Sequence, residues 1–401
     1  MPQLVPSLAI GMTMTADFAT WIPDGPGVQS VLHGRYRWLV CVMTAEKEPH
    51  LSVARTATSP SAVQVVDLFC GVGGLTRGLE DSGINVVAGL DSDADCEYAY
   101  SVNNDARFVH ANLLETSSDE IESMWSAGAV RVLVGCAPCQ PYSKYSRGTS
   151  KEDPSAPVLR FAKYVDDLRP AVVSMENVPA VSRHPAFNGF LETLASAGYH
   201  ISWETLPASG FGVPQTRKRL VLMASRLAPI ALPASNVAKA KTVRQAIGRL
   251  VPISAGEANK VDPTHRASAL SAVNLERIRN SRPGGTWRDW PDDLRAACHK
   301  GESGATFPAV YGRMEWDVPA PTVTTQFFGY GNGRFGHPVQ DRAISLREGA
   351  LLQTFPQDYK FEKAETLRSF ALVGRHIGNA VPVALAKQIG NAINSHLEKY
   401  I

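Results

Sequence analysis

The sequence predicts an α/β protein built on a doubly wound, mainly parallel sheet. Short apolar runs rich in β-branched residues alternate with helical stretches over residues 63–225, which is the pattern of such a sheet. The alternation stops over residues 226–340, which are rich in Pro, Gly, Arg and Thr, and it returns after them. These observations predict a smaller, irregular domain inserted into the sheet domain.

Five apolar runs give the expected strands, and the stretches between and after them give the helices. Each strand is short and bounded by turn-forming or polar residues, as buried strands are. The expected strands are Val63–Phe69, Val86–Leu90, Val130–Val134, Ala171–Met175 and Leu220–Met223. The expected helices are Leu75–Leu79, Ala94–Val102, Pro157–Leu168, Phe187–Ala197, Leu346–Thr354 and Pro382–Leu397.

The chain divides into four segments on this pattern. We expect residues 62–225 and 341–401 to form one discontinuous domain, with residues 226–340 inserted between its two parts. Residues 1–61 have no sustained period and end in Thr58-Ser59-Pro60-Ser61. They are interpreted either as a flexible extension or as sequence upstream of a true start at Met43.

Composition and charge limit the class of protein. With 44% hydrophobic and 19% charged residues, the chain is neither wholly disordered nor a coiled coil. It has no signal segment and no apolar run long enough to span a membrane, and its six cysteines are scattered, so we expect a cytoplasmic protein. Residues 213–350 hold 20 Lys and Arg against 11 Asp and Glu, a net charge of +9. Such a segment indicates either a polyanionic partner or a solvated basic face.

A glycine-rich loop follows the first expected strand. In Asp67-Leu-Phe-Cys-Gly-Val-Gly-Gly74, the glycines allow a ligand to approach the backbone at the start of a helix. Asp91 closes the next strand, 20 residues after Gly71, a spacing that suits a carboxylate on ribose hydroxyls. The alternative is a tight strand–helix turn, because the third glycine position of a dinucleotide fingerprint holds Thr76.

Two cysteines follow the strand Val130–Val134, in Gly135-Cys-Ala-Pro-Cys-Gln-Pro141. The carboxyl ends of strands are where open α/β sheets bind ligands, so a cysteine here is a candidate nucleophile. The spacing between Cys136 and Cys139 also permits a redox dithiol or an inert buried pair. Zinc would need further ligands, and no second such motif is present.

Three further motifs lie at ends of expected elements. Glu176 in Met-Glu-Asn-Val-Pro ends the strand after Ala171, where it faces the same crevice or is merely solvated. Arg217 and Arg219 in Gln-Thr-Arg-Lys-Arg precede a strand, and their alternation points both side chains the same way. Gly378-Asn-Ala-Val-Pro382 predicts a turn before the last helix.

Taken together in this order, the motifs resemble those of the DNA (cytosine-5) methyltransferases that use S-adenosyl-methionine. The resemblance runs from Val63 to Ile401 and rests on DLFCGVGG, PCQPYS, ENVP, QTRKR, REGALLQTFP and GNAVP. It implies the Rossmann-like sheet of class I methyltransferases, with residues 226–340 as the target-recognition domain. By this resemblance the cofactor-binding residues are Phe69, Gly71, Gly73, Gly74, Asp91, Asn112 and Asn379.

The resemblance also assigns the catalytic residues. Cys139 is the nucleophile that adds to C6 of cytosine, Glu176 bonds N3 and the exocyclic amine, and Arg219 lies near O2 with Arg217 beside it. The DNA contacts implied are those of Gln140, Ser143 and Gln215. The target base must be flipped out of the duplex to be reached.

The expected protein is therefore a DNA modification enzyme, a monomer by default, that acts on double-stranded DNA. A restriction endonuclease with the same specificity is expected as its companion, without direct contact. Three alternatives remain: a tRNA cytosine-5 methyltransferase of the same fold, a catalytically dead DNA-binding module, and a dithiol oxidoreductase that uses Cys136 and Cys139. No metal is expected.

Overall fold

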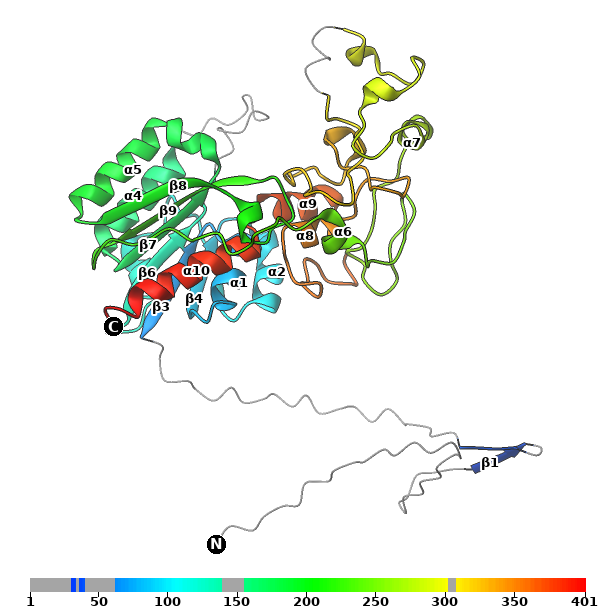
Figure 1. Cartoon of the computed structure of the whole chain (residues 1–401). Helices are drawn as coiled ribbons and strands as arrows, with labels where there is room; N and C mark the ends of the chain where they lie inside the picture. Colours follow the sequence, from blue (N-terminus) through cyan, green and yellow to red (C-terminus); the bar gives the residue numbers. More distant parts are fainter. Residues whose placement is uncertain (1–29, 34–35, 40–61, 139–154, 302–307) are drawn as a thin grey trace. The chain divides into compact units, whose positions relative to one another are not determined.

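The computed structural model describes residues 62–138, 155–301 and 308–401, and a hairpin of β1 (Ser30–His33) and β2 (Tyr36–Leu39). The chain divides into two units, Met1–Thr58 and Ser59–Ile401, both of which Figure 1 draws. In the first unit the two strands pair antiparallel, an element that the sequence did not predict. Cys139, Gln140 and Ser143 lie outside the described residues.

The second unit is built on a seven-stranded sheet of order β5-β4-β3-β6-β7-β9-β8. All of its pairings are parallel except those of β9 with β7 and with β8. From β3 the chain adds β4 and β5 on one side of the sheet, and from β6 it adds β7 on the other side. The strand order therefore reverses between β3 and β6, and this position is a topological switch point. The strands are β3 (Val63–Leu68), β4 (Val86–Asp91), β5 (Arg107–His110), β6 (Val130–Gly135), β7 (Val172–Asn177), β8 (His200–Pro207) and β9 (Lys218–Ser225).

Helices cover both faces of this sheet. Because side chains alternate along a strand, Val66 and Leu68 of β3 lie in the core beneath α4 and α5, whereas Val65 lies beneath α1 and α10 (Figure 1). Around these layers lie α2, α3, α8 and α9. Their bounds are α1 (Gly74–Glu80), α2 (Glu97–Asn103), α3 (Ser118–Glu122), α4 (Ala156–Leu168), α5 (Pro185–Ser196), α8 (Leu346–Leu352), α9 (Phe370–Asn379) and α10 (Val383–Leu397).

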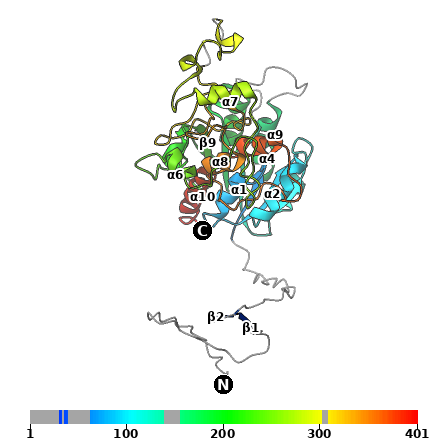
Figure 2. The same ribbon diagram turned by 90° about the vertical axis from the view of Figure 1, so that its right-hand side faces the viewer.

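The C-terminal segment returns to the start of the sheet domain. Helix α10 packs along α1, and a Cβ on Gly78 would lie only 2.3 Å from the Cβ of Ala386. Figure 2 shows α10 and α1 close together again after a quarter turn. The close approach requires glycine at position 78, because any side chain there would separate the helices.

Residues 226–340 hold little regular structure in their described part. Their α-helices are the short α6 (Val243–Ile247) and α7 (Ala272–Arg279). A separate apolar cluster packs Trp287, Trp290 and Tyr330 against Ile278. Aromatic rings therefore replace the alternating aliphatic layers of the sheet domain here.

The expected elements lie where the sequence predicted them, but the described part of the chain holds others as well. The short strand β5, the edge strand β8 and the helices α3, α6, α7 and α9 were not predicted. The expected turn at Gly378 and Asn379 is a correction, since both residues form the last turn of α9. No helix in the described parts is both long and apolar enough to cross a membrane.

Candidate active site

The glycine loop turns sharply between β3 and α1. Phe69 has a φ of 58°, and Gly71 and Gly73 have φ values of 52° and 87°, all in the left-handed region. A Cβ on Gly73 would lie 2.4 Å from Asn104 Nδ2, so glycine is required there by both conformation and space. A Cβ on Gly71 would meet no atom within 4 Å, so the backbone is open to a ligand on that side.

Asp91, the last residue of β4, is bonded to this loop. Its Oδ2 accepts a hydrogen bond from the Gly71 backbone N–H at 2.8 Å, and its Oδ1 accepts one from Asp93 N–H at 2.9 Å. Burial raises the pKa of Asp91, against the lowering effect of these two backbone donors. The carboxylate is therefore held in a fixed orientation at the carboxyl edge of the sheet.

Asp67 is the second acidic group at this edge, and it is fully buried. Its Oδ2 accepts a hydrogen bond from Thr76 Oγ1 at 2.7 Å, while its buried Oδ1 has no hydrogen-bond partner among the described residues. Burial raises the pKa of Asp67 to about 7, although the Thr76 bond lowers it. An unused oxygen on a half-protonated acid can receive a donor from a bound ligand.

The other two expected cofactor residues lie at the same edge. Asn112 follows β5 by two residues and is exposed, and its Oδ1 accepts from Leu114 N–H at 3.1 Å. Asn379 is also exposed, at the end of α9. Each amide therefore reaches solvent from an element that ends near the glycine loop.

Glu176 and Arg219 meet because β9 runs antiparallel to β7. Glu176 pairs with Val221 in the sheet, so the start of β9 lies beside the end of β7. Glu176 is 2% exposed, and its Oε1 lies 2.9 Å from Arg219 Nε. On its other oxygen, Glu176 accepts a hydrogen bond from the Cys136 thiol, with Sγ 3.1 Å from Oε2.

Asn177 is a residue of this site that sequence reasoning missed. It is fully buried, and its Nδ2 donates to the Ala137 carbonyl at 3.1 Å, while its Oδ1 accepts from Val178 N–H at 2.8 Å. It thus ties the end of β7 to the loop that leads from β6 toward Cys139. Its place beside Glu176 in the motif was the available signal.

Arg217 and Gln215 have roles that differ from those expected. Arg217 is 1% exposed and donates to the carbonyls of Val323 at 3.0 Å and Gly378 at 3.3 Å. Gln215 has no exposed surface, and its Nε2 donates to Leu352 O and its Oε1 accepts from Val323 N–H. A side chain without exposed surface offers nothing to a duplex, so the expected DNA contact of Gln215 is replaced by a link between chain segments.

One cluster in the described part of the chain has the residue types of a metal site. The potential ligand atoms of Asp93, Cys96 and His376 lie within 4.8 Å of one another. However, Asp93 Oδ2 lies 3.0 Å from both His376 Nε2 and Arg375 Nη2. A cation would have to displace the guanidinium, so we assign no metal to these residues.

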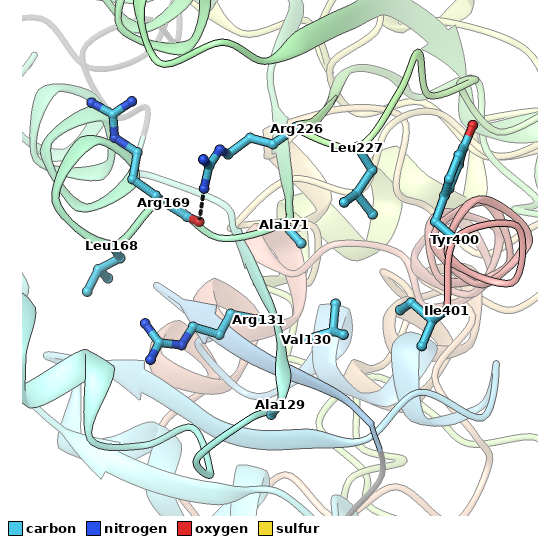
Figure 3. A pocket seen from close by; sticks show the side chains of 10 residues that line it. All are labelled: Ala129, Val130, Arg131, Leu168, Arg169, Ala171, Arg226, Leu227, Tyr400 and Ile401. Carbon is cyan, nitrogen blue, oxygen red and sulfur yellow. Dashed lines mark hydrogen bonds between the residues drawn. The ribbon is translucent and has the colours of Figure 1, made fainter.

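A pocket of about 530 Å³ lies at the opposite edge of the sheet (Figure 3). It is lined by Val130 at the start of β6, and Arg131, Arg169 and Arg226 surround it. Arg131 pairs with Glu122, Arg169 with Asp166, and Arg226 donates to the Arg169 carbonyl. The pocket lies at the edge of the sheet where β6 begins. The candidate active-site residues lie at the other edge, where the parallel strands end, so this pocket is not the active site.

The fold and the site together define a Rossmann-like protein of the class I methyltransferase type. A glycine loop and an acid at a strand end mark one side of the switch point, and a buried Glu–Arg pair marks the other. The model of one family, the C-5 cytosine-specific DNA methylases, matches residues 63–395, and the chain belongs to this family.

Relatives agree with that assignment, and solved structures share the fold. The Type II methylase M.HgiDII of Herpetosiphon aurantiacus is 47% identical over 339 residues, covering 83% of this chain and 96% of the relative. A putative DNA modification methyltransferase from an E. coli prophage has a TM-score of 0.64 at 20% identity, covering 84% and 99% of the two chains. The DNMT2 of Spodoptera frugiperda has a TM-score of 0.59 at 15% identity, covering 83% and 99%.

Proposed function

We propose that this protein methylates C5 of cytosine in a short sequence of double-stranded DNA, with Cys139 as nucleophile and Glu176 and Arg219 as the groups that hold the ring. The observation that carries this proposal is the buried Glu176–Arg219 pair, 2.9 Å apart, at the sheet edge where the Cys139 loop begins. The 47% identity to a Type II methylase supports a modification enzyme as the biological role.

The chemistry needs this arrangement. C5 of cytosine is too weak a nucleophile to take a methyl group directly, so a thiolate first adds to C6 and makes C5 enamine-like. Negative charge then develops on the ring and must be stabilised where it forms. Glu176, when protonated, donates to N3, and Arg219 donates to O2. C5 then forms its bond to the methyl group that the cofactor supplies, and loss of the C5 proton to a base with expulsion of the Cys139 thiolate from C6 restores the ring.

S-adenosyl-methionine is the proposed cofactor, and it supplies an electrophilic methyl group on a sulfonium. The fixed carboxylate of Asp91 suits its adenosine part, by accepting from ribose hydroxyls, and the open backbone at Gly71 suits its methionine end. The unused Oδ1 of Asp67 suits a donor such as an ammonium group. Phe69, Gly73, Gly74, Asn112 and Asn379 complete the proposed cofactor site.

We further propose that residues 226–340 recognise the DNA, inserted between the catalytic parts at 62–225 and 341–401. Exposed Lys and Arg side chains would contact phosphates, and others would read base edges. Gln140 and Ser143 belong to the proposed DNA-contacting loop. Gln215 and Arg217 are proposed as positioning residues, because their buried bonds tie that segment to Val323 and to α8 and α9.

The surroundings of the enzyme are also proposals. We propose a monomer in the cytoplasm that protects DNA from a companion restriction endonuclease without binding to it. A tRNA substrate is the second candidate. The fold that this protein shares with the DNMT2 structure does not discriminate between DNA and tRNA as the substrate. The genes beside this one test the companion, and sedimentation tests the monomer.

One labelling experiment tests the reaction and the substrate together. The purified protein is incubated with tritiated S-adenosyl-methionine and either unmethylated genomic DNA or total tRNA, and bisulfite sequencing then locates the methyl groups. We expect label at cytosines of one short repeated DNA motif. Label in tRNA alone would replace the substrate, and no label in either nucleic acid would reject the enzyme.

Two cysteine variants are the matched pair for the nucleophile. We expect Cys139→Ala to abolish labelling, whereas Cys136→Ala keeps substantial activity, because the Cys136 thiol donates to Glu176 and is not the proposed nucleophile. Cys136→Ser restores that donor. Equal loss of activity in Cys136→Ala and Cys139→Ala would instead indicate a dithiol mechanism.

A further inference from the structure

A buried histidine of the C-terminal segment forms a hydrogen bond with the loop that follows Asp91. His376 lies on α9, is 7% exposed, and its Nε2 is 3.0 Å from Asp93 Oδ2. The contact joins residues 283 positions apart in the chain. An ionised carboxylate only accepts hydrogen bonds, so the His376 ring must donate here.

Asp93 connects His376 to Asp91, the residue proposed to bind the ribose. Its backbone N–H donates to Asp91 Oδ1 at 2.9 Å, and its own Oδ1 accepts from Asp95 N–H at 3.1 Å. Burial raises the pKa of Asp93, but the His376 hydrogen bond, the Asp95 N–H and the Arg375 charge together lower it by more. The pKa of Asp93 therefore lies below its ordinary value, and the carboxylate stays ionised near neutral pH. The side chain is therefore a charged link between α9 and the end of β4.

The other end of α9 is fixed independently. Arg217 donates to the Gly378 carbonyl at 3.3 Å, and Gln353 Nε2 donates to the carbonyls of Ile377 at 2.8 Å and Ala380 at 3.0 Å. These bonds hold the turn of α9 that ends in Asn379. Helix α9 is thus bonded at its end to the catalytic side of the sheet and through His376 to the cofactor side.

We propose that His376 is a positioning residue for cofactor binding, which acts through Asp93 to set the Asp91 carboxylate relative to Asn379. The inference rests on the proposed cofactor roles of Asp91 and Asn379. Its function is separate from catalysis, because in the described part of the chain the His376 side chain is hydrogen-bonded to Asp93 and not to Glu176 or Arg219. Its loss should therefore weaken cofactor binding without slowing methyl transfer at saturating cofactor.

The test compares two buried histidines. His376→Leu is expected to raise the Kd for S-adenosyl-methionine, measured by calorimetry on the full chain, about five- to twenty-fold. This is the change expected when part of the energy of a charged hydrogen bond contributes to cofactor binding. The rate at saturating cofactor and the KM for DNA should stay within about twofold. His376→Gln keeps a side-chain N–H and should recover most of the affinity.

His396 provides the matched control. It is 5% exposed and makes one side-chain hydrogen bond, from Nε2 to Ser225 Oγ at 2.7 Å, on α10. His396→Leu should lower the melting temperature as His376→Leu does but leave the cofactor Kd unchanged. A wild-type Kd in His376→Leu, or equal Kd changes in both variants, would overturn the inference.

A double substitution tests the proposed route. If His376 acts through Asp93, the Kd of His376→Leu combined with Asp93→Asn should match that of the weaker-binding single variant. Multiplying effects would show that the two residues act separately and would reject the link. Wild-type protein that binds no S-adenosyl-methionine would contradict the proposed function itself, which is a distinct outcome.

Discussion

Arg217 and Arg219 stand two residues apart, yet their surroundings differ. Arg219 pairs with the Glu176 carboxylate at 2.9 Å and its side chain is 12% exposed. Arg217 is buried and bonds backbone carbonyls of two other segments. The alternation in sequence predicted that both side chains lie at one site. It could not reveal that the backbone carbonyls of Val323 and Gly378 lie beside Arg217 in the fold. The structure therefore separates a candidate ring-binding group from a candidate fold-stabilising one.

Substitution of each arginine should affect a different property. Arg217→Ala leaves buried carbonyls unsatisfied and should lower the free energy of unfolding by about 3 kcal/mol, while folded molecules keep most of their turnover rate. Arg219→Ala should lower that rate at least about 100-fold. Urea unfolding and single-turnover methylation at one temperature measure both effects. Normal stability in Arg217→Ala would contradict its assignment as a positioning residue.

Asp67 should make the stability of the unliganded protein depend on pH. Burial raises its pKa from 3.8 to about 7, so between these pH values the folded state binds more protons than the unfolded state. Stability therefore falls as pH rises, by about 1.4 kcal/mol per unit, or about 2 kcal/mol from pH 5.5 to 7 as an upper estimate.

Asp67→Asn removes this titration and should reveal its contribution. Compared with wild type, the variant should gain relative stability as pH rises from 5.5 to 7, measured by urea unfolding at each pH. Asp119→Asn is the control, because Asp119 is an exposed carboxylate at the start of α3. Parallel pH profiles for wild type and Asp67→Asn would mean that Asp67 titrates normally in the fold.

Among the elements, those predicted from sequence are the buried ones. The core of β3 and the apolar face of α10 carry strong patterns, so both were predicted within a residue or two. Strand β8 lies at the sheet edge and exposes polar residues on much of its length, and β5 has only four residues. Their pairing partners, rather than their own sequences, make them strands.

Site residues were predictable from sequence where a motif ends a strand. Contacts between residues were not predictable where they depend on the direction of a neighbouring strand. Glu176 ends β7 as expected, but its contact with Arg219 depends on the antiparallel direction of β9, which the short run Leu220–Met223 does not reveal. The last two residues of helix α9 were interpreted as part of a turn and the rest of the helix was not predicted, although Ser369 caps its start by accepting from Leu372 N–H. The tie from His376 to Asp93 was hidden for the same reason.

Two helical glycines should respond oppositely to alanine. At Gly78 a Cβ would lie 2.3 Å from Ala386 Cβ and 2.5 Å from the Val383 carbonyl, so Gly78→Ala should push α10 from α1 and destabilise the fold by at least about 2 kcal/mol. At Gly189 on α5 the nearest atom is 3.8 Å away, so Gly189→Ala should stabilise by up to about 1 kcal/mol. Urea unfolding measures both, and a stabilised Gly78→Ala would disprove the close helix contact.

For the whole molecule, the basic segment 213–350 is less basic at its surface than in its sequence. Five of its arginines are buried, and four of these pair with carboxylates: Arg266 with Glu362, Arg313 with Asp341, Arg342 with Glu348, and Arg347 with Asp262. These buried pairs hold segments together and are closed to a polyanion. We propose that the attraction for DNA comes from the exposed basic side chains, among them Arg249, Arg282 and Lys300.

Salt dependence distinguishes exposed charges that contact phosphate from those that do not. Each phosphate contact contributes about 0.9 to the slope of log affinity against log salt. Changing Arg249, Arg282 and Lys300 together to Gln should reduce that slope by up to about 2.7, measured by fluorescence anisotropy on duplex DNA between 50 and 200 mM salt. The control changes Arg131, Arg169 and Arg226, at the opposite edge of the sheet (Figure 3), and should leave the slope unchanged. Equal reductions in both triple variants would mean that net charge, rather than the inserted segment, binds the duplex.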